Sequence, residues 1–121
     1  MVLYLEINPA RLSEKAKEIL LNPKTEVFIS AISVAEIACG YEKRFRLKEH
    51  WRPWLRKIIE TNGWNIIPVE FEIMEEAYSL PEPFHRDPAD RIIVATSRIR
   101  QIPVMTNDGL ISEYPYVTVC W

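Results

Sequence analysis

The chain has 121 residues, of which 48% are hydrophobic and 26% charged, so it is long enough for one domain with a core and too short for two. Its formal net charge of −2 indicates no class of partner, and its 3 glycines exclude a glycine-rich phosphate-binding loop. No apolar run approaches the roughly 18 residues of a membrane span, and no basic segment precedes the apolar N-terminal residues. We therefore expect a single cytoplasmic domain over residues 1–121, with no membrane association.

Helix and strand patterns alternate along the chain. Apolar residues at helical spacing predict helices at residues 10–21, 33–46, 48–61 and 70–78. The apolar face of the last of these is expected to consist of Phe71, Met74, Ala77 and Tyr78. Short apolar runs between turn residues predict strands at residues 26–30, 65–69, 102–106 and 116–119. Pro68 places the second strand at a sheet edge, or ends it there.

Residues 87–98 carry two conflicting patterns. The run Ile92-Ile93-Val94 suits a strand, but Asp87 suits a helix N-cap and Pro88 the first helical position, so a helix is favoured. The resulting alternation predicts an α/β domain in three layers, with a mostly parallel sheet between helices.

A basic segment extends from Lys43 to Lys57. Its only acid is Glu49, and it holds seven of the 15 basic residues: Lys43, Arg44, Arg46, Lys48, Arg52, Arg56 and Lys57. Basic side chains beside Trp51 and Trp54 suit a nucleic-acid backbone and unstacked bases. We therefore take Arg52, Arg56 and Lys57 as candidate RNA-binding residues. The spacing of the two tryptophans favours one helix face that packs against the protein or a partner.

Three acids follow predicted strands, at the places where parallel sheets collect functional groups. Glu36 follows the strand at 26–30, Asp90 lies in the first turn of the helix at 87–98, and Asp108 follows the strand at 102–106. If they converge, their oxygens suit Mg²⁺ or Mn²⁺, which can activate water and offset charge on a phosphodiester.

Each acid also has a structural interpretation. Glu36 can belong to a capping box that begins at Ser33, Asp87 and Asp90 can cap a helix, and Asp108-Gly109 is a common turn. Arg91 suits a phosphate ligand, an exposed helix residue or a salt-bridge partner, and His85 suits a proton shuttle or a loop residue that bonds its neighbours.

Three segments resemble the PIN domain family, and more closely its VapC-type toxins. Residues 27–38 resemble the family's second strand and acid-bearing helix, and residues 102–108 resemble the strand that delivers its last acid as T-x-D. The most specific segment is His85-Arg86-Asp87-Pro88-Ala89-Asp90-Arg91, which resembles an H-x-D-P-x-D-R pattern.

The resemblance implies a ribonuclease that uses Mg²⁺ or Mn²⁺. Its metal-binding and catalytic acids correspond to Glu36, Asp90 and Asp108, and its accessory residues to Asp87, Thr106 and His85. It further implies an RNA substrate, a cognate antitoxin partner and a homodimer.

The N-terminus departs from the family pattern, in which the first strand ends in an aspartate. Residues 2–13 look like the part that follows that aspartate, and no aspartate precedes Asp87. We therefore expect the first acid and most or all of a central strand to be missing, with weak or no nuclease activity for this chain and an active longer form that begins upstream.

Three functions remain open. The first is the metal-dependent endoribonuclease, and the second is a catalytically impaired PIN-like module that binds an antitoxin or RNA. The third is a generic α/β domain without a metal site.

Overall fold

The computed structural model describes residues 2–4, 12–43 and 50–121. Their strands form one parallel sheet in the order β3-β2-β1-β4-β5. The strands are β1 (Val2–Tyr4), β2 (Val27–Ser30), β3 (Asn65–Ile67), β4 (Val104–Met105) and β5 (Val119–Cys120). The helices are α1 (Glu14–Leu21), α2 (Ala31–Lys43), α3 (Trp51–Asn62), α4 (Phe71–Ala77), α5 (Pro88–Arg100) and α6 (Gly109–Ser112). The predicted α/β class and parallel sheet are confirmed.

Strand β1 lies in the middle of the sheet and is buried on both faces. It pairs with β2 through Val2 and Leu3, and with β4 through Leu3 and Tyr4. The expectation that a central strand is missing is therefore wrong. Three apolar residues suffice because both neighbouring strands satisfy their backbone groups and helices cover both faces.

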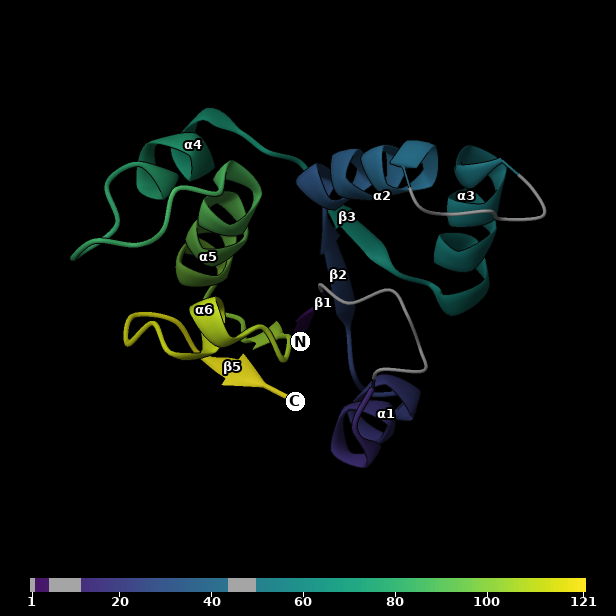
Figure 1. Ribbon diagram of the computed structural model, residues 1–121. Helices are drawn as coiled ribbons and strands as arrows, with labels where there is room; N and C mark the ends of the chain where they lie inside the picture. Colours follow the sequence, from purple (N-terminus) through teal and green to yellow (C-terminus); the bar gives the residue numbers. More distant parts are fainter. Residues whose placement is uncertain (1, 5–11, 44–49) are drawn as a thin grey trace.

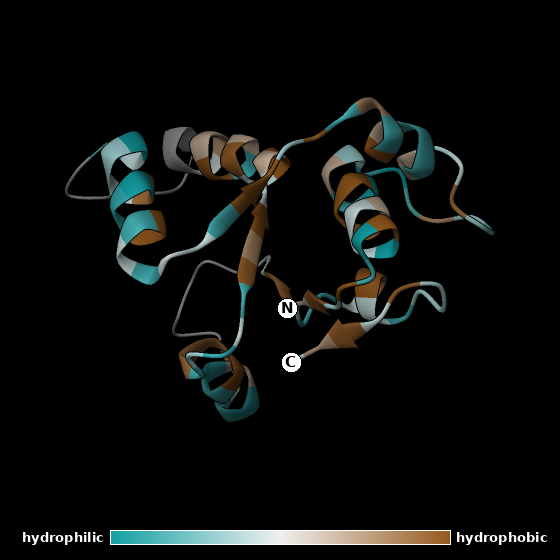
Figure 2. Ribbon diagram, turned by 180° about the vertical axis from the view of Figure 1, so that it is seen from behind, coloured by the Kyte–Doolittle hydropathy of each residue, from teal (hydrophilic) through white to brown (hydrophobic). Residues whose placement is uncertain are grey.

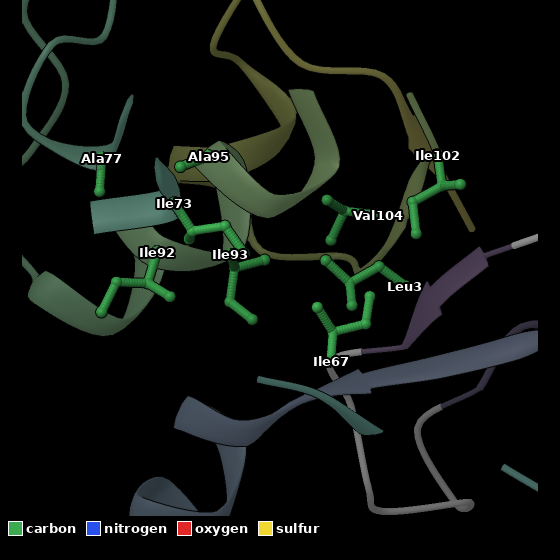
Figure 3. Packing of buried hydrophobic residues seen from close by; sticks show 9 residues of the cluster. All are labelled: Leu3, Ile67, Ile73, Ala77, Ile92, Ile93, Ala95, Ile102 and Val104. Atoms are coloured by element: carbon green, nitrogen blue, oxygen red, sulfur yellow. The ribbon is translucent and has the colours of Figure 1, made fainter. Parts of the chain in front are cut away.

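Alternate residues of β1 point to opposite layers. Leu3 is fully buried among Ile67, Ile93 and Val104, in a cluster to which α4 and α5 also contribute (Figure 3). Val2 and Tyr4 pack on the other face against Ala16 of α1. The sheet is thus enclosed between α5 and α4 on one face and α1 on the other, which confirms the three-layer arrangement (Figure 1). Figure 2 shows the hydrophobic residues along β2 at the centre of the molecule.

Most of the predicted elements occur near their expected positions. Residues 87–98 belong to a helix, α5, and Asp87 is its N-cap. Pro68 follows the end of β3, which is an edge strand, as expected. The expected apolar face of α4 is confirmed for Ala77, which is buried, and wrong for Phe71, Met74 and Tyr78, which are exposed; Ile73 is buried in their place. Helix α6 was not predicted.

In the described part of the chain, no helix combines the length and the apolar content that crossing a membrane requires.

Candidate metal centre

One pocket lies at the sheet edge where β2 and β4 end. Its volume is about 460 Å³, and its lining comes from three chain segments that are far apart in sequence. The lining residues are Ile32, Ser33, Glu36, Asp87, Ala89, Asp90, Ile93, Thr106, Asn107 and Asp108. Because β2 and β4 are parallel, the segments that follow them reach the same edge. Glu36, Asp90 and Asp108 thus line one pocket, together with Asp87 and Thr106.

The carboxylates share the pocket without closing around a single point. Among the residues that the structure describes, no three His, Cys, Asp or Glu side chains are gathered closely enough to hold a metal ion. Like charges repel when no cation lies between them, so an open arrangement is the one that electrostatics favours in the ion-free protein.

Asp90 is subject both to burial and to this repulsion. Its side chain is 23% exposed, and its pKa is raised from 3.8 to about 6. Burial is the largest cause, followed by the negative charge of Asp87, while Asp108 and Glu36 raise the pKa further and His85 lowers it. The pocket therefore combines desolvation with an excess of negative charge, two conditions that a bound cation would relieve.

His85 contacts Asp90 from outside the pocket lining. Its Nε2 lies 3.0 Å from Oδ2 of Asp90, but it is buried and makes no hydrogen bond of acceptable geometry with a described residue. Its Nδ1 accepts the backbone N–H of Asp87 at 3.4 Å, so the proton of the neutral ring lies on Nε2, toward Asp90. The contact is thus a close electrostatic approach.

Arg91 fixes the loop that carries His85. Its guanidinium donates to the backbone carbonyls of Ala77, Phe84 and His85 at 3.0, 2.9 and 3.0 Å. It also lies over the ring of Tyr78, at 5.4 Å from the centroid. These contacts leave Arg91 half-buried, which overturns its interpretation as an exposed helix residue, and no described acid forms a salt bridge with it. Its role as a phosphate ligand stays a prediction. Arg91 joins the start of α5 to the loop before it.

The capping interpretation holds for Asp87 and fails for Glu36. Oδ1 of Asp87 accepts the backbone N–H groups of Ala89 and Asp90 at 2.9 and 3.2 Å. Helix α2, however, begins at Ala31, directly after β2, so Ser33 lies inside the helix and is not its N-cap. The proposed capping box at Ser33 is therefore wrong, and Glu36 is exposed one turn further along α2.

Asp108 likewise caps nothing with its side chain. It occupies the N-cap position of α6, but its carboxylate makes no capping hydrogen bond. Its backbone is held by Thr106, which is buried and whose Oγ1 accepts the N–H of Asp108 at 3.1 Å. Thr106 therefore positions the segment that brings Asp108 to the pocket.

Two polar residues of the pocket, Ser33 and Asn107, were not predicted as site residues. Ser33 is 4% exposed, and its Oγ has no hydrogen-bond partner among the described residues. Its position one turn before Glu36 was the available signal, which the capping-box interpretation explained in another way.

The candidate RNA-binding residues lie outside the pocket. Arg52, Arg56 and Lys57 are exposed on α3, which packs beside α2 (Figure 1). Trp51 and Trp54 are half-buried, and Trp54 lines an apolar groove with Leu12 and Leu20 near α1. The packing interpretation of the tryptophans thus holds for Trp54. Residues 44–49 of the basic segment lie outside the described residues.

Comparisons with known proteins agree with this architecture. The family model described as "PIN domain" matches residues 2–115. Curated proteins gave no match. A chain of a toxin–antitoxin complex from Klebsiella pneumoniae is similar, with 22% identity, 100% of this chain and 97% of that chain covered, and a TM-score of 0.71.

Two further solved structures are similar. One is a chain of VapBC2 from Rickettsia felis, in a complex with a DNA fragment from the VapBC2 promoter. It is 18% identical, with 99% of this chain and 98% of that chain covered, and its TM-score is 0.74. A chain of FitAcB from Neisseria gonorrhoeae is 21% identical over 98% and 96%, with a TM-score of 0.61. At these identities the likeness concerns the fold. The family model covers nearly the whole chain, and the strands of this chain form the parallel sheet described above. The chain therefore belongs to the PIN domain family.

Proposed function

We propose that this chain is a divalent-metal-dependent endoribonuclease, the toxin of a toxin–antitoxin pair that acts in the cytoplasm. The observation that carries the proposal is the pocket in which Glu36, Asp90 and Asp108 meet at one edge of the sheet of a PIN domain protein. Neither a capping role for Glu36 nor one for the Asp108 side chain accounts for these acids.

The pocket suits Mg²⁺ or Mn²⁺ chemically. The acidic and hydroxyl side chains that line it offer oxygen, the donor that these hard cations prefer. Glu36, Asp90 and Asp108 would hold the ion, and a bound ion would supply an activated water and offset the charge on the phosphodiester. The raised pKa of Asp90 supports the fit, because the pocket carries negative charge that the protein leaves uncompensated.

The chain's own residues have distinct tasks in this proposal. Asp87 caps α5 and so holds the backbone that carries Asp90, while Thr106 holds the backbone of Asp108. His85 approaches Asp90 and orients its carboxylate. The exposed cations of α3, namely Arg52, Arg56 and Lys57, attract the RNA backbone outside the acidic pocket.

Protein partners belong to the same proposal. The similar structures include toxin–antitoxin complexes, and we infer a cognate antitoxin and a second copy of this chain as partners. Two apolar surfaces suit such contacts. One is the groove of about 540 Å³ between α1 and α3, and the other is the exposed set Phe71, Met74 and Tyr78 on α4.

A second function is a catalytically impaired PIN module that binds an antitoxin or RNA. It is favoured by the absence of an aspartate before Asp87 in the sequence, whereas the open arrangement of the carboxylates in the described residues is expected for the ion-free protein in either function. The expectation of weak activity rested on a missing strand and a missing acid. The presence of β1 removes the first reason, and the second remains.

Cleavage of a labelled single-stranded RNA separates the two functions. The nuclease predicts cleavage that requires Mn²⁺ or Mg²⁺, stops with EDTA and is lost in Asp90→Asn. Binding of RNA or of an antitoxin without any cleavage, by a folded protein, supports the impaired module. A protein that binds no Mn²⁺ in calorimetry contradicts the proposed function and leaves a generic α/β domain.

A further inference from the structure

The hydroxyl of Ser33 is buried without a hydrogen-bond partner among the described residues. The residue is 4% exposed, and no described group bonds its Oγ. A serine inside a helix commonly bonds the carbonyl four residues earlier. Here that residue is Ile29, which belongs to β2, because α2 begins only two residues before Ser33. Buried polar groups are rarely left unpaired, since they lose their bonds to water and gain none in return.

This hydroxyl lines the acidic pocket, which needs donors. Glu36, Asp87, Asp90 and Asp108 can only accept hydrogen bonds when ionised. The other buried hydroxyl of the lining, that of Thr106, already accepts the backbone N–H of Asp108, whereas the Ser33 hydroxyl bonds no described residue. A phosphodiester brings anionic oxygens, which are also acceptors. The hydroxyl proton of Ser33 can therefore offset the repulsion between the lining carboxylates and the anionic oxygens of a phosphodiester.

The start of α2 adds to this effect. Ser33 lies in the first turn of a helix of 13 residues, where the helix dipole is positive and favours an anion. The first turn of α5 also reaches the pocket, but Asp87 already accepts two of its N–H groups. In α2 the N–H of Ile32 is also taken, by Oγ of Ser30, so the Ser33 hydroxyl, which bonds no described residue, is the donor on the α2 side that suits a phosphate oxygen.

We propose that the Ser33 hydroxyl donates a hydrogen bond to a non-bridging oxygen of the scissile phosphodiester. This inference rests on the proposed function and adds a neutral catalytic residue to the acids of the pocket. Ser33 keeps its bonds throughout and acts only as a donor. No described residue bonds its hydroxyl, as is expected if the partner arrives with the substrate.

The test compares Ser33→Ala with Ser33→Thr. In Ser33→Ala, the thermal midpoint should stay equal to that of the original chain or rise, because no hydrogen bond to a described residue is lost. The Mn²⁺ affinity in calorimetry should change less than about twofold, while the single-turnover rate at saturating RNA should fall about 10- to 100-fold, as expected for one lost donor to a developing charge. Ser33→Thr keeps the hydroxyl and should recover most of the rate.

Ser97→Ala is the matched control. Ser97 is also 4% exposed, but its hydroxyl donates to the carbonyl of Ile102, away from the acidic pocket. This variant should lower the thermal midpoint and leave the cleavage rate per folded molecule unchanged. If Ser33→Ala behaves in the same way, Ser33 is structural and the inference is overturned. A loss of Mn²⁺ affinity without RNA would assign Ser33 to the ion and overturn it as well.

A binding measurement keeps this inference separate from the proposed function. RNA affinity is measured by fluorescence anisotropy in EDTA, where metal-dependent cleavage is off. If the original chain cleaves RNA and Ser33→Ala cleaves equally well, the inference fails and the function stands. If the original chain does not cleave RNA, the proposed nuclease function fails, and the RNA affinity of Ser33→Ala relative to the original chain tests the contact between Ser33 and phosphate. A threefold or greater loss in Ser33→Ala then supports the contact with phosphate, and an unchanged affinity overturns it.

Discussion

Asp90→Asn should stabilise the ion-free protein. The pKa of Asp90 is raised from 3.8 to about 6, so the charged form is disfavoured in the folded state relative to the unfolded state. Each tenfold change in an equilibrium constant is about 1.4 kcal/mol, so the full rise would correspond to about 3 kcal/mol of destabilisation at neutral pH. Because the carboxylate is partly exposed and water screens it, we expect about 1–2 kcal/mol. The amide of asparagine has nearly the same size and carries no charge. For a chain of this length, the gain amounts to a thermal midpoint about 5 °C higher.

The pH dependence of the free energy of unfolding tests the stabilising effect of Asp90→Asn a second time. Because the pKa is raised on folding, the stabilisation linked to protonated Asp90 is fully present below pH 3.8 and is lost as the pH rises through about 6. Urea denaturation in EDTA should therefore show the largest advantage of Asp90→Asn near pH 7.5 and almost none near pH 4. The same variant should bind Mn²⁺ more weakly.

The opposite result would refute the electrostatic description of the pocket. If Asp90→Asn is less stable than the original chain at pH 7.5 in EDTA, Asp90 makes a favourable contact that outweighs its repulsion from Asp87, Asp108 and Glu36. If the gain in stability of Asp90→Asn over the original chain does not become smaller toward pH 4, the charge of the Asp90 carboxylate is not its cause.

Two further variants test separate parts of the structure. Arg91→Lys should lower the free energy of unfolding by about 2–4 kcal/mol, because an ammonium cannot donate to three carbonyls in the directions that the guanidinium serves; unchanged urea denaturation would contradict the anchoring role. A triple alanine variant of α3 should weaken RNA binding and reduce the slope of log affinity against log salt by about 2, three lost contacts at about 0.7 each; an unaltered slope would assign this face to solubility. Its substitutions are Arg52→Ala, Arg56→Ala and Lys57→Ala.

The sequence was sufficient to predict the junctions that carry acids. Asp87 and Pro88 give a local start signal for α5, and that signal outweighed the strand-like run at residues 92–94. The alternation of strands and helices indicated a parallel sheet, from which the meeting of Glu36, Asp90 and Asp108 at one edge was expected. These inferences depend on neighbours in the chain or on the general geometry of parallel sheets.

The errors concern features that distant contacts decide. The three residues of β1 are too few for a periodic signal, and their place between β2 and β4 depends on pairing across the sheet. Ser33 matched a local capping pattern, but α2 continues directly from β2 and begins earlier. On α4, the face turned to the core is the one with Ile73 and Ala77, because α5 packs there. The partners of Arg91 include a carbonyl 14 residues earlier, which no local pattern indicates.

Calorimetric titration of Mn²⁺ into the purified 121-residue chain tests the central claim most directly. The original chain should bind the ion at one site, with an affinity that falls in Glu36→Gln and in Asp108→Asn, although both variants stay folded. Proton release should accompany binding near pH 6, because the pKa of Asp90 lies there and its carboxylate must be ionised to bind. Binding that both variants retain in full, or no binding by the folded chain, would contradict a metal site in this pocket.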